Sequence, residues 1–98
     1  ILEKIAENDL EQFSKYKVDG DLPVQGKLVV GEATADLGGL TLAYHAFHNS
    51  KEFKDAPTIN SLTPDQQFFL GTAHVWASNI RPEQARNLAT TDPHPPMI

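Results

Sequence analysis

The chain of 98 residues contains no cysteine. This absence excludes a disulfide framework and any metal site built on thiolates. Long apolar runs are also missing, since no stretch approaches the roughly 20 residues that span a bilayer. Basic residues are few, because 8 Lys and Arg stand against 13 Asp and Glu, for a net charge of −5. We therefore expect no binding to nucleic acid or to an anionic membrane surface, both of which require clustered basic side chains.

The remaining composition, 40% hydrophobic and 8% aromatic, is that of an ordinary small globular chain. Its length allows one domain at most. The sequence begins at Ile1 rather than Met, in a pattern that is already helical, and it stops directly after "PHPPM". We therefore expect residues 1–98 to be a single fragment of a larger protein.

Hydrophobic spacing predicts a mainly α-helical fold with about four helices and at most one short strand. The expected helices cover residues 1–17, 32–49, 63–80 and 81–91. A capping box marks the third helix, with Thr63 before Pro64 and Gln66 three residues after the cap. The apolar residues of this helix occupy most of its circumference, which predicts that the helix is largely buried. Before the second helix, "KLVV" favours a short extended segment, and "SKEFKDAPTINS" is expected to be a connector.

Two carboxylates stand four residues apart in "GEATADLGGL", residues 31–40. On a wheel of 100° per residue, Glu32 and Asp36 fall within the apolar arc that carries Leu40, Tyr44 and Phe47. A buried carboxylate needs a cation, a hydrogen-bond donor or a proton, because losing its hydration costs several kcal/mol. The alternative is that the pair caps the helix or lines a solvent cleft, since acids are common near helix starts.

Other features of these helices have simpler interpretations. His45 and His48 could chelate a metal at their spacing, but both fall on the polar face of the wheel and are expected to be solvent-exposed. His74 borders a polar strip and is interpreted in the same way. The adjacent Gly38 and Gly39 each cost a helix ~1 kcal/mol relative to Ala, which suggests that something large approaches the backbone there.

Three blocks of the sequence, taken in order, resemble one family. "GEATADLGGLTLAY" resembles the E-x-x-x-D segment of the neprilysin and endothelin-converting-enzyme family of zinc metallopeptidases. "TPDQQFFLGTAHVWASNIRPEQAR" resembles the family's Q-x-F-F-L, V-W and R-P-E-x-A stretch, and "TDPHPP" resembles its T-D-x-H-S-P segment. The resemblance runs from about residue 13 to the end. The E-x-x-x-D spacing alone would be weak, whereas three ordered blocks are specific.

The resemblance implies roles for individual residues. Glu32 matches the third zinc ligand, which joins two histidines of an H-E-x-x-H helix and leaves the fourth position to water. Asp36 matches the acid that orients one of those histidines. His94 matches the histidine that donates a hydrogen bond to the oxyanion of the tetrahedral intermediate. Val75 and Trp76 match walls of the pocket for the substrate side chain that follows the scissile bond.

Asp92 is a further candidate, because its spacing suggests that it orients His94. The prolines on both sides of His94 fix the local backbone, which would hold a catalytic donor steady. Taken alone, His94 is equally a surface histidine in a Pro-rich tail, and Trp76 a simple core residue.

The departures from the family pattern limit what this chain can do. No H-E-x-x-H occurs, so two zinc ligands and the general-base Glu are missing. Pro95 stands where Ser is usual, which is a mild change. Ala77 stands where vertebrate members carry Cys, and together with the absence of cysteine this favours a bacterial relative. The resemblance therefore implies part of the helical half of a thermolysin-like zincin catalytic domain, without the H-E-x-x-H helix.

The implied function is part of a zinc-dependent endopeptidase that cleaves on the amino side of hydrophobic residues. We expect the fragment itself to be inactive and to bind no tight stoichiometric zinc. The implied partners are peptide substrates and the rest of the catalytic domain, with self-association of the fragment as a further expectation. The implied compartment is the periplasm or another extracytoplasmic space of a bacterium, with the cytoplasm as the alternative. The alternative function is a non-enzymatic helical interaction module, which an upstream H-E-x-x-H in the gene would exclude.

Overall fold

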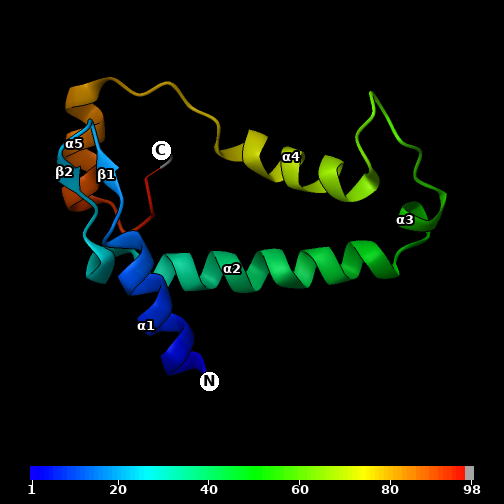
Figure 1. Ribbon diagram of the computed structural model, residues 1–98, viewed down its shortest axis with the longest axis horizontal. Helices are drawn as coiled ribbons and strands as arrows, with labels where there is room; N and C mark the ends of the chain where they lie inside the picture. Colours follow the sequence, from blue (N-terminus) through cyan, green and yellow to red (C-terminus); the bar gives the residue numbers. More distant parts are fainter. Residues whose placement is uncertain (97–98) are drawn as a thin grey trace. The chain divides into compact units, whose positions relative to one another are not determined.

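A computed structural model describes residues 1–96. In these residues the fold is mainly α-helical, as the sequence predicts, with five helices and one small two-stranded hairpin (Figure 1). The chain divides into two compact units. Unit 1 comprises residues 1–37 together with the chain from Asn79 onward, and unit 2 comprises Gly38–Ser78. The long helix α2 (Gly26–Asn49) contributes to both units.

Unit 1 gathers helix α1 (Leu2–Phe13), the hairpin and helix α5 (Pro82–Thr91) around the start of α2 (Figure 1). Helix α1 is shorter than the predicted helix over residues 1–17. It ends at Phe13, and the hydroxyl of the following residue, Ser14, donates to the carbonyl of Leu10 at 2.7 Å. Helix α5 agrees with the expected range of 81–91, with Pro82 in the first turn where its missing N–H costs nothing.

The hairpin joins strand β1 (Lys17–Val18) to strand β2 (Leu22–Pro23) in antiparallel register, with Val18 opposite Leu22. The turn bends through Asp19 and Gly20, whose φ values are 51° and 80°. Asp and Gly tolerate this left-handed region better than other residues, so the "VDGD" segment is suited to a tight turn. Two paired strands replace the one short strand that the sequence allowed.

The segment "KLVV" is helical rather than extended, which corrects the sequence prediction. It forms the first turns of α2, where Val29 is only 1% exposed. The preference of β-branched residues for strands is weak, and burial against the hairpin and α5 overrides it. Val29 belongs to the core of unit 1 together with Val18, Val24 and Ala89, and that core is lined by Phe13, Leu22, Leu28 and Ala85.

Unit 2 contains the end of α2, a short helix α3 (Lys51–Asp55) and helix α4 (Pro64–Trp76). Helix α3 lies in the expected connector and begins at Ser50, whose hydroxyl accepts the N–H of Phe53 at 3.1 Å. The predicted capping box of α4 is confirmed, because the side chains and N–H groups of Thr63 and Gln66 bond reciprocally. The helix ends at Trp76 rather than at residue 80.

The prediction that α4 is largely buried is wrong for the described chain, since none of its residues is buried. One side of the helix packs on rings of α2, where Phe68 stacks on Phe47 with centroids 5.4 Å apart. The rest carries apolar side chains that the described residues leave open, including Leu70 at 58% and Val75 at 77% exposed. Gly38 and Gly39 are likewise exposed, and no atom lies within 4 Å of a Cβ placed there, so nothing in residues 1–96 explains the pair.

No helix within residues 1–96 combines the length and the hydropathy needed to cross a bilayer.

Candidate functional site

Glu32 and His94 meet in unit 1, although they come from distant parts of the sequence. Glu32 lies in the second turn of α2, and His94 lies in the segment that follows α5. The Nε2 atom of His94 is 3.4 Å from Oε2 of Glu32. The side chains are 42% and 45% exposed, so both remain open to solvent and to a ligand. The fold thus brings together two of the residues to which the sequence assigns catalytic chemistry.

Asp92 fixes the backbone on which His94 sits. It caps the C-terminus of α5, with its N–H donating to the carbonyl of Leu88 at 2.8 Å. Its Oδ1 accepts the backbone N–H of His94 at 3.0 Å and lies 3.8 Å from Nδ1 of the same imidazole. Pro95, the next residue, is buried. Asp92 is therefore placed where an orienting residue for His94 is expected, and that role stays a prediction.

Asp36 does not face an apolar interior, which corrects the helical-wheel prediction. Its side chain is exposed, and Glu32 one turn earlier is only partly buried. The apolar arc is partly buried further along the helix, at Leu40, Tyr44 and Phe47, but at Asp36 it is exposed in the described chain. In the described chain both carboxylates therefore keep much of their hydration, and the desolvation cost that the wheel implied is small.

Three hydrogen bonds that sequence reasoning missed connect the elements around Glu32. Thr34 donates from α2 to the half-buried Asp9 of α1 at 2.9 Å. Arg86 of α5 donates to Asp19 at 3.3 Å and to Asp21 at 2.7 Å, both in the hairpin turn. The hydrogen bond from Arg86, aided by its charge, lowers the pKa of Asp21 below the ordinary value. The sequence shows acidic residues near position 20 and a basic residue at position 86, but only the fold shows that these residues form ion pairs.

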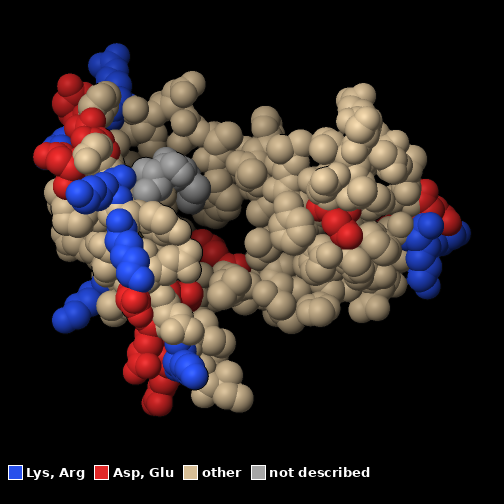
Figure 2. Space-filling view, in the orientation of Figure 1, with Lys and Arg blue, Asp and Glu red and all other residues tan. Residues whose placement is uncertain are grey.

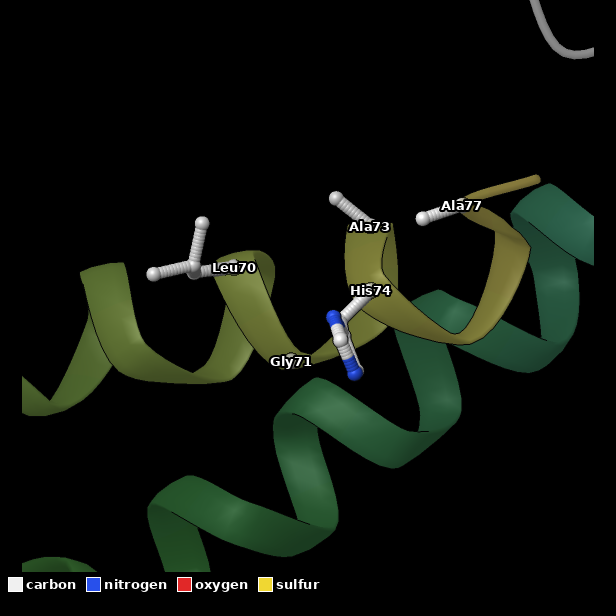
Figure 3. Close-up of a pocket in the computed structure, with 5 residues that line it drawn as sticks. All are labelled: Leu70, Gly71, Ala73, His74 and Ala77. Carbon is white, nitrogen blue, oxygen red and sulfur yellow. The ribbon is translucent and has the colours of Figure 1, made fainter. Parts of the chain in front are cut away.

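Val75 and Trp76, the predicted pocket walls, lie at the end of α4 in unit 2 and are 77% and 39% exposed. An open apolar depression of about 580 Å³ occupies the same end of the helix. It is lined by Leu70, Gly71, Ala73, His74 and Ala77. In Figure 3, Leu70 and Ala73 project to one side of the helix and His74 to another.

Charge is unevenly distributed over the surface shown in Figure 2. Charged residues are dense over unit 1, and over unit 2 they gather near α3, so that most of the surface over α4 is uncharged. Within α4, Asp65 is the only Asp, Glu, Lys or Arg residue. The exposed end of α4 is therefore suited to an apolar partner or side chain.

His48 is not simply solvent-exposed, which corrects a second expectation. Its Nε2 lies 2.6 Å from Oδ1 of Asp65, and its ring stacks on Phe53 with centroids 4.0 Å apart. Tyr44 donates to the same carboxylate at 3.2 Å. Burial and then the bond to Asp65 raise the pKa of Tyr44 above its ordinary value. His45 and His74 are exposed, as expected.

Zinc in catalytic sites is held by three protein ligands and a water. Within residues 1–96, no group of three His, Cys, Asp or Glu is arranged to hold a metal. Glu32 and His94 supply two suitable donors, an accessible carboxylate and an imidazole. The described residues therefore fit part of a zinc site and not a whole one, and no catalytic step can be derived from this chain alone.

Comparison with known proteins decides the family. The sequence profile of Peptidase family M13 matches residues 2–98. The chain belongs to peptidase family M13. Members of this family are zinc metallopeptidases, in agreement with the resemblance of the three sequence blocks.

Curated relatives of this M13 chain include endothelin-converting enzyme 1 from Cavia porcellus and from Homo sapiens, each 45% identical over 91 residues. Neprilysin-1 from Caenorhabditis elegans is 40% identical over 94 residues. Each alignment covers 89% of this chain and 12% of the relative, so the chain spans about one eighth of their length. No solved structure gives a significant match. The named relatives are animal proteins and lend no support to a bacterial origin.

Proposed function

We propose that this M13 chain is part of a zinc-dependent endopeptidase that cleaves peptides on the amino side of hydrophobic residues. The observation that carries the proposal is the contact between Glu32 and His94, 3.4 Å apart in unit 1. Two residues that the family resemblance assigns to one active site are thus neighbours in the fold.

Each site residue has a distinct task in this proposal. Glu32 holds the zinc, and Asp36, one turn further along α2, steadies a histidine ligand from another segment. His94 donates to the oxyanion that forms on the substrate carbonyl, and Asp92 limits its movement through the backbone bond of 3.0 Å. Bound zinc would polarise that carbonyl and lower the pKa of a water molecule.

Substrate preference is assigned to unit 2 in the same proposal. Val75 and Trp76 present apolar surface that the described residues do not cover, which is suited to a hydrophobic side chain of the substrate. The 98-residue chain is proposed to be inactive by itself, because it lacks the H-E-x-x-H segment that would supply two ligands and the general base.

The test is a peptidase assay of the natural gene product that contains this segment, with the cleavage sites mapped by mass spectrometry. Cleavage is expected before Phe, Leu, Ile or Val, and a chelator should abolish it. His94→Gln should lower kcat by about 10²–10³, the usual cost of losing one oxyanion donor. His45→Gln is the matched control, because His45 is exposed on the same helix as Glu32 and should leave kcat unchanged. A full-rate His94→Gln enzyme would contradict the assignment.

A second candidate function is a non-enzymatic interaction module, which the uncovered apolar face of α4 favours. The gene discriminates between the two. An H-E-x-x-H upstream of Ile1 supports the peptidase, and its absence, together with an inactive gene product, supports the module.

A further inference from the structure

We propose that Arg86 is a positioning residue of the catalytic site. By bonding to Asp19 and Asp21 it holds α5 against the hairpin, and α5 in turn keeps His94 beside Glu32. The role rests on the proposed function, because Arg86 acts through the oxyanion donor His94. The family resemblance assigns no task to Arg86, which follows the R-P-E-x-A motif in the sequence.

His94 owes its position to α5, the helix that precedes it. Asp92 caps the end of α5 and accepts the backbone N–H of His94 at 3.0 Å. Prolines fix the backbone on both sides of His94, and one of them, Pro95, is buried. The segment after α5 is therefore too short and too constrained to absorb a displacement of the helix. A shift of α5 would move the imidazole away from Glu32, which now lies 3.4 Å from it.

The apolar contacts of α5 do little to fix the helix along its axis. The core of unit 1 includes Ala89, and Ala85 packs against that core. Each of these side chains is a single methyl group, which buries little apolar surface and has no preferred direction of contact. The placement of α5 over the hairpin therefore requires a directional contact as well.

Arg86 supplies that contact. Its Nη1 donates to Oδ1 of Asp21 at 2.7 Å and to Oδ2 of Asp19 at 3.3 Å. The two acids stand on either side of Gly20 in the hairpin turn, so one guanidinium group bonds to both sides of the turn. The bonds to Asp21 and Asp19 raise the pKa of Arg86, and the bond from Arg86 lowers the pKa of Asp21. The charged forms of these groups are thus the favoured ones.

The hairpin is in turn fixed to α2, the helix that carries Glu32. Helix α2 begins at Gly26, and only residues 24 and 25 separate it from strand β2. Val24 is 3% exposed, and its N–H donates to the carbonyl of Tyr16 at 2.9 Å. Figure 1 shows α5 beside the hairpin, close to the start of α2. Arg86 therefore joins the helix before the oxyanion donor to the segment that leads into the helix of the proposed zinc ligand.

A double-mutant cycle in the peptidase assay of the natural gene product tests this role. Arg86→Ala should lower kcat about tenfold with KM unchanged, because a misplaced donor stabilises the transition state less. In a His94→Gln background the same substitution should cost less than about twofold, since no donor is left to misplace. Arg86→Lys should restore part of kcat through its charge. Lys15→Ala is the matched control, because it breaks an exposed ion pair of 2.7 Å with Glu11 and should leave kcat unchanged.

An equal loss in both backgrounds would overturn the positioning role, because a residue that only stabilises the fold lowers both rates alike. A gene product without peptidase activity would instead refute the proposed function. The position of His94 is then measured in the 98-residue chain by nitrogen-15 spectra of the imidazoles, with far-UV circular dichroism to check the fold.

In these spectra Glu32→Gln should shift the ring nitrogens of His94, because the two side chains lie 3.4 Å apart. The shift should persist in a Lys15→Ala background and should fall at least about twofold in an Arg86→Ala background, where the pair has separated. An undiminished shift in the Arg86→Ala background would overturn the positioning role whatever the activity of the gene product.

Discussion

Replacing Gly26 with alanine should destabilise the chain, because the first turn of α2 passes close to the end of α1. Gly26 is buried, and a Cβ placed there would overlap Oγ of Ser14 and lie 2.5 Å from the carbonyl oxygen of Leu10. The hydroxyl of Ser14 can rotate away at the cost of its bond to Leu10. The main-chain oxygen of Leu10 cannot, so α1 must shift.

The magnitude follows from two opposing effects. Overpacking of this kind costs about 1–3 kcal/mol, and the contact with main chain favours the upper end. Alanine regains up to about 1 kcal/mol of helix propensity. We expect a net loss of about 2 kcal/mol in the free energy of unfolding, or roughly 10 °C in melting temperature for a chain of this length.

Urea unfolding followed by far-UV circular dichroism measures this loss, and Gly31→Ala is the matched control. Gly31 lies in the same helix, but no atom is within 4 Å of its Cβ position, so alanine should stabilise by about 0.5–1 kcal/mol. The two substitutions are identical in chemistry and opposite in expected sign. A Gly26→Ala variant as stable as Gly31→Ala would refute the packing of α1 against α2.

Three further predictions concern stability and association. Arg86 lowers the pKa of Asp21 in the folded chain. Their ion pair therefore stabilises the fold above the unfolded-state pKa of about 3.9, and this stabilisation is lost as pH falls through the lower folded-state pKa. Asp21→Asn should reduce the urea midpoint at pH 7 and should match wild type near about pH 2. Thr63→Ala should cost about 1 kcal/mol in the same assay, because it removes the cap of α4. The exposed face of α4 should drive self-association at high concentration, which light scattering detects and Val75→Asp should reduce, whereas a monomer at every concentration would argue against it.

Local signals in the sequence predicted the elements whose ends depend on a few neighbouring residues. Thr63 and Gln66 bond to each other within one turn, so the capping box and the start of α4 were visible without any tertiary information. The start of α2 was not, because Val29 is helical through burial against the hairpin and α5, and the strand preference of its neighbours is weaker than that burial.

The candidate site was only partly predictable for the same reason. The family blocks pointed to Glu32 and His94 separately, and the return of the chain after α5 brings them to 3.4 Å. The wheel misplaced Asp36, since periodicity reports which side of a helix is apolar and not whether anything covers it. The bond of His48 to Asp65 required knowledge of where α4 begins in space.

The zinc content of the natural gene product tests the central claim most directly. Elemental analysis of the purified protein and of its Glu32→Gln variant is the measurement, with Glu52→Gln, an exposed residue of α3, as the control. The account predicts one zinc per molecule in the wild type and the control, and a loss of at least about tenfold in the Glu32→Gln variant. A Glu32→Gln variant that retains its full zinc would contradict the account.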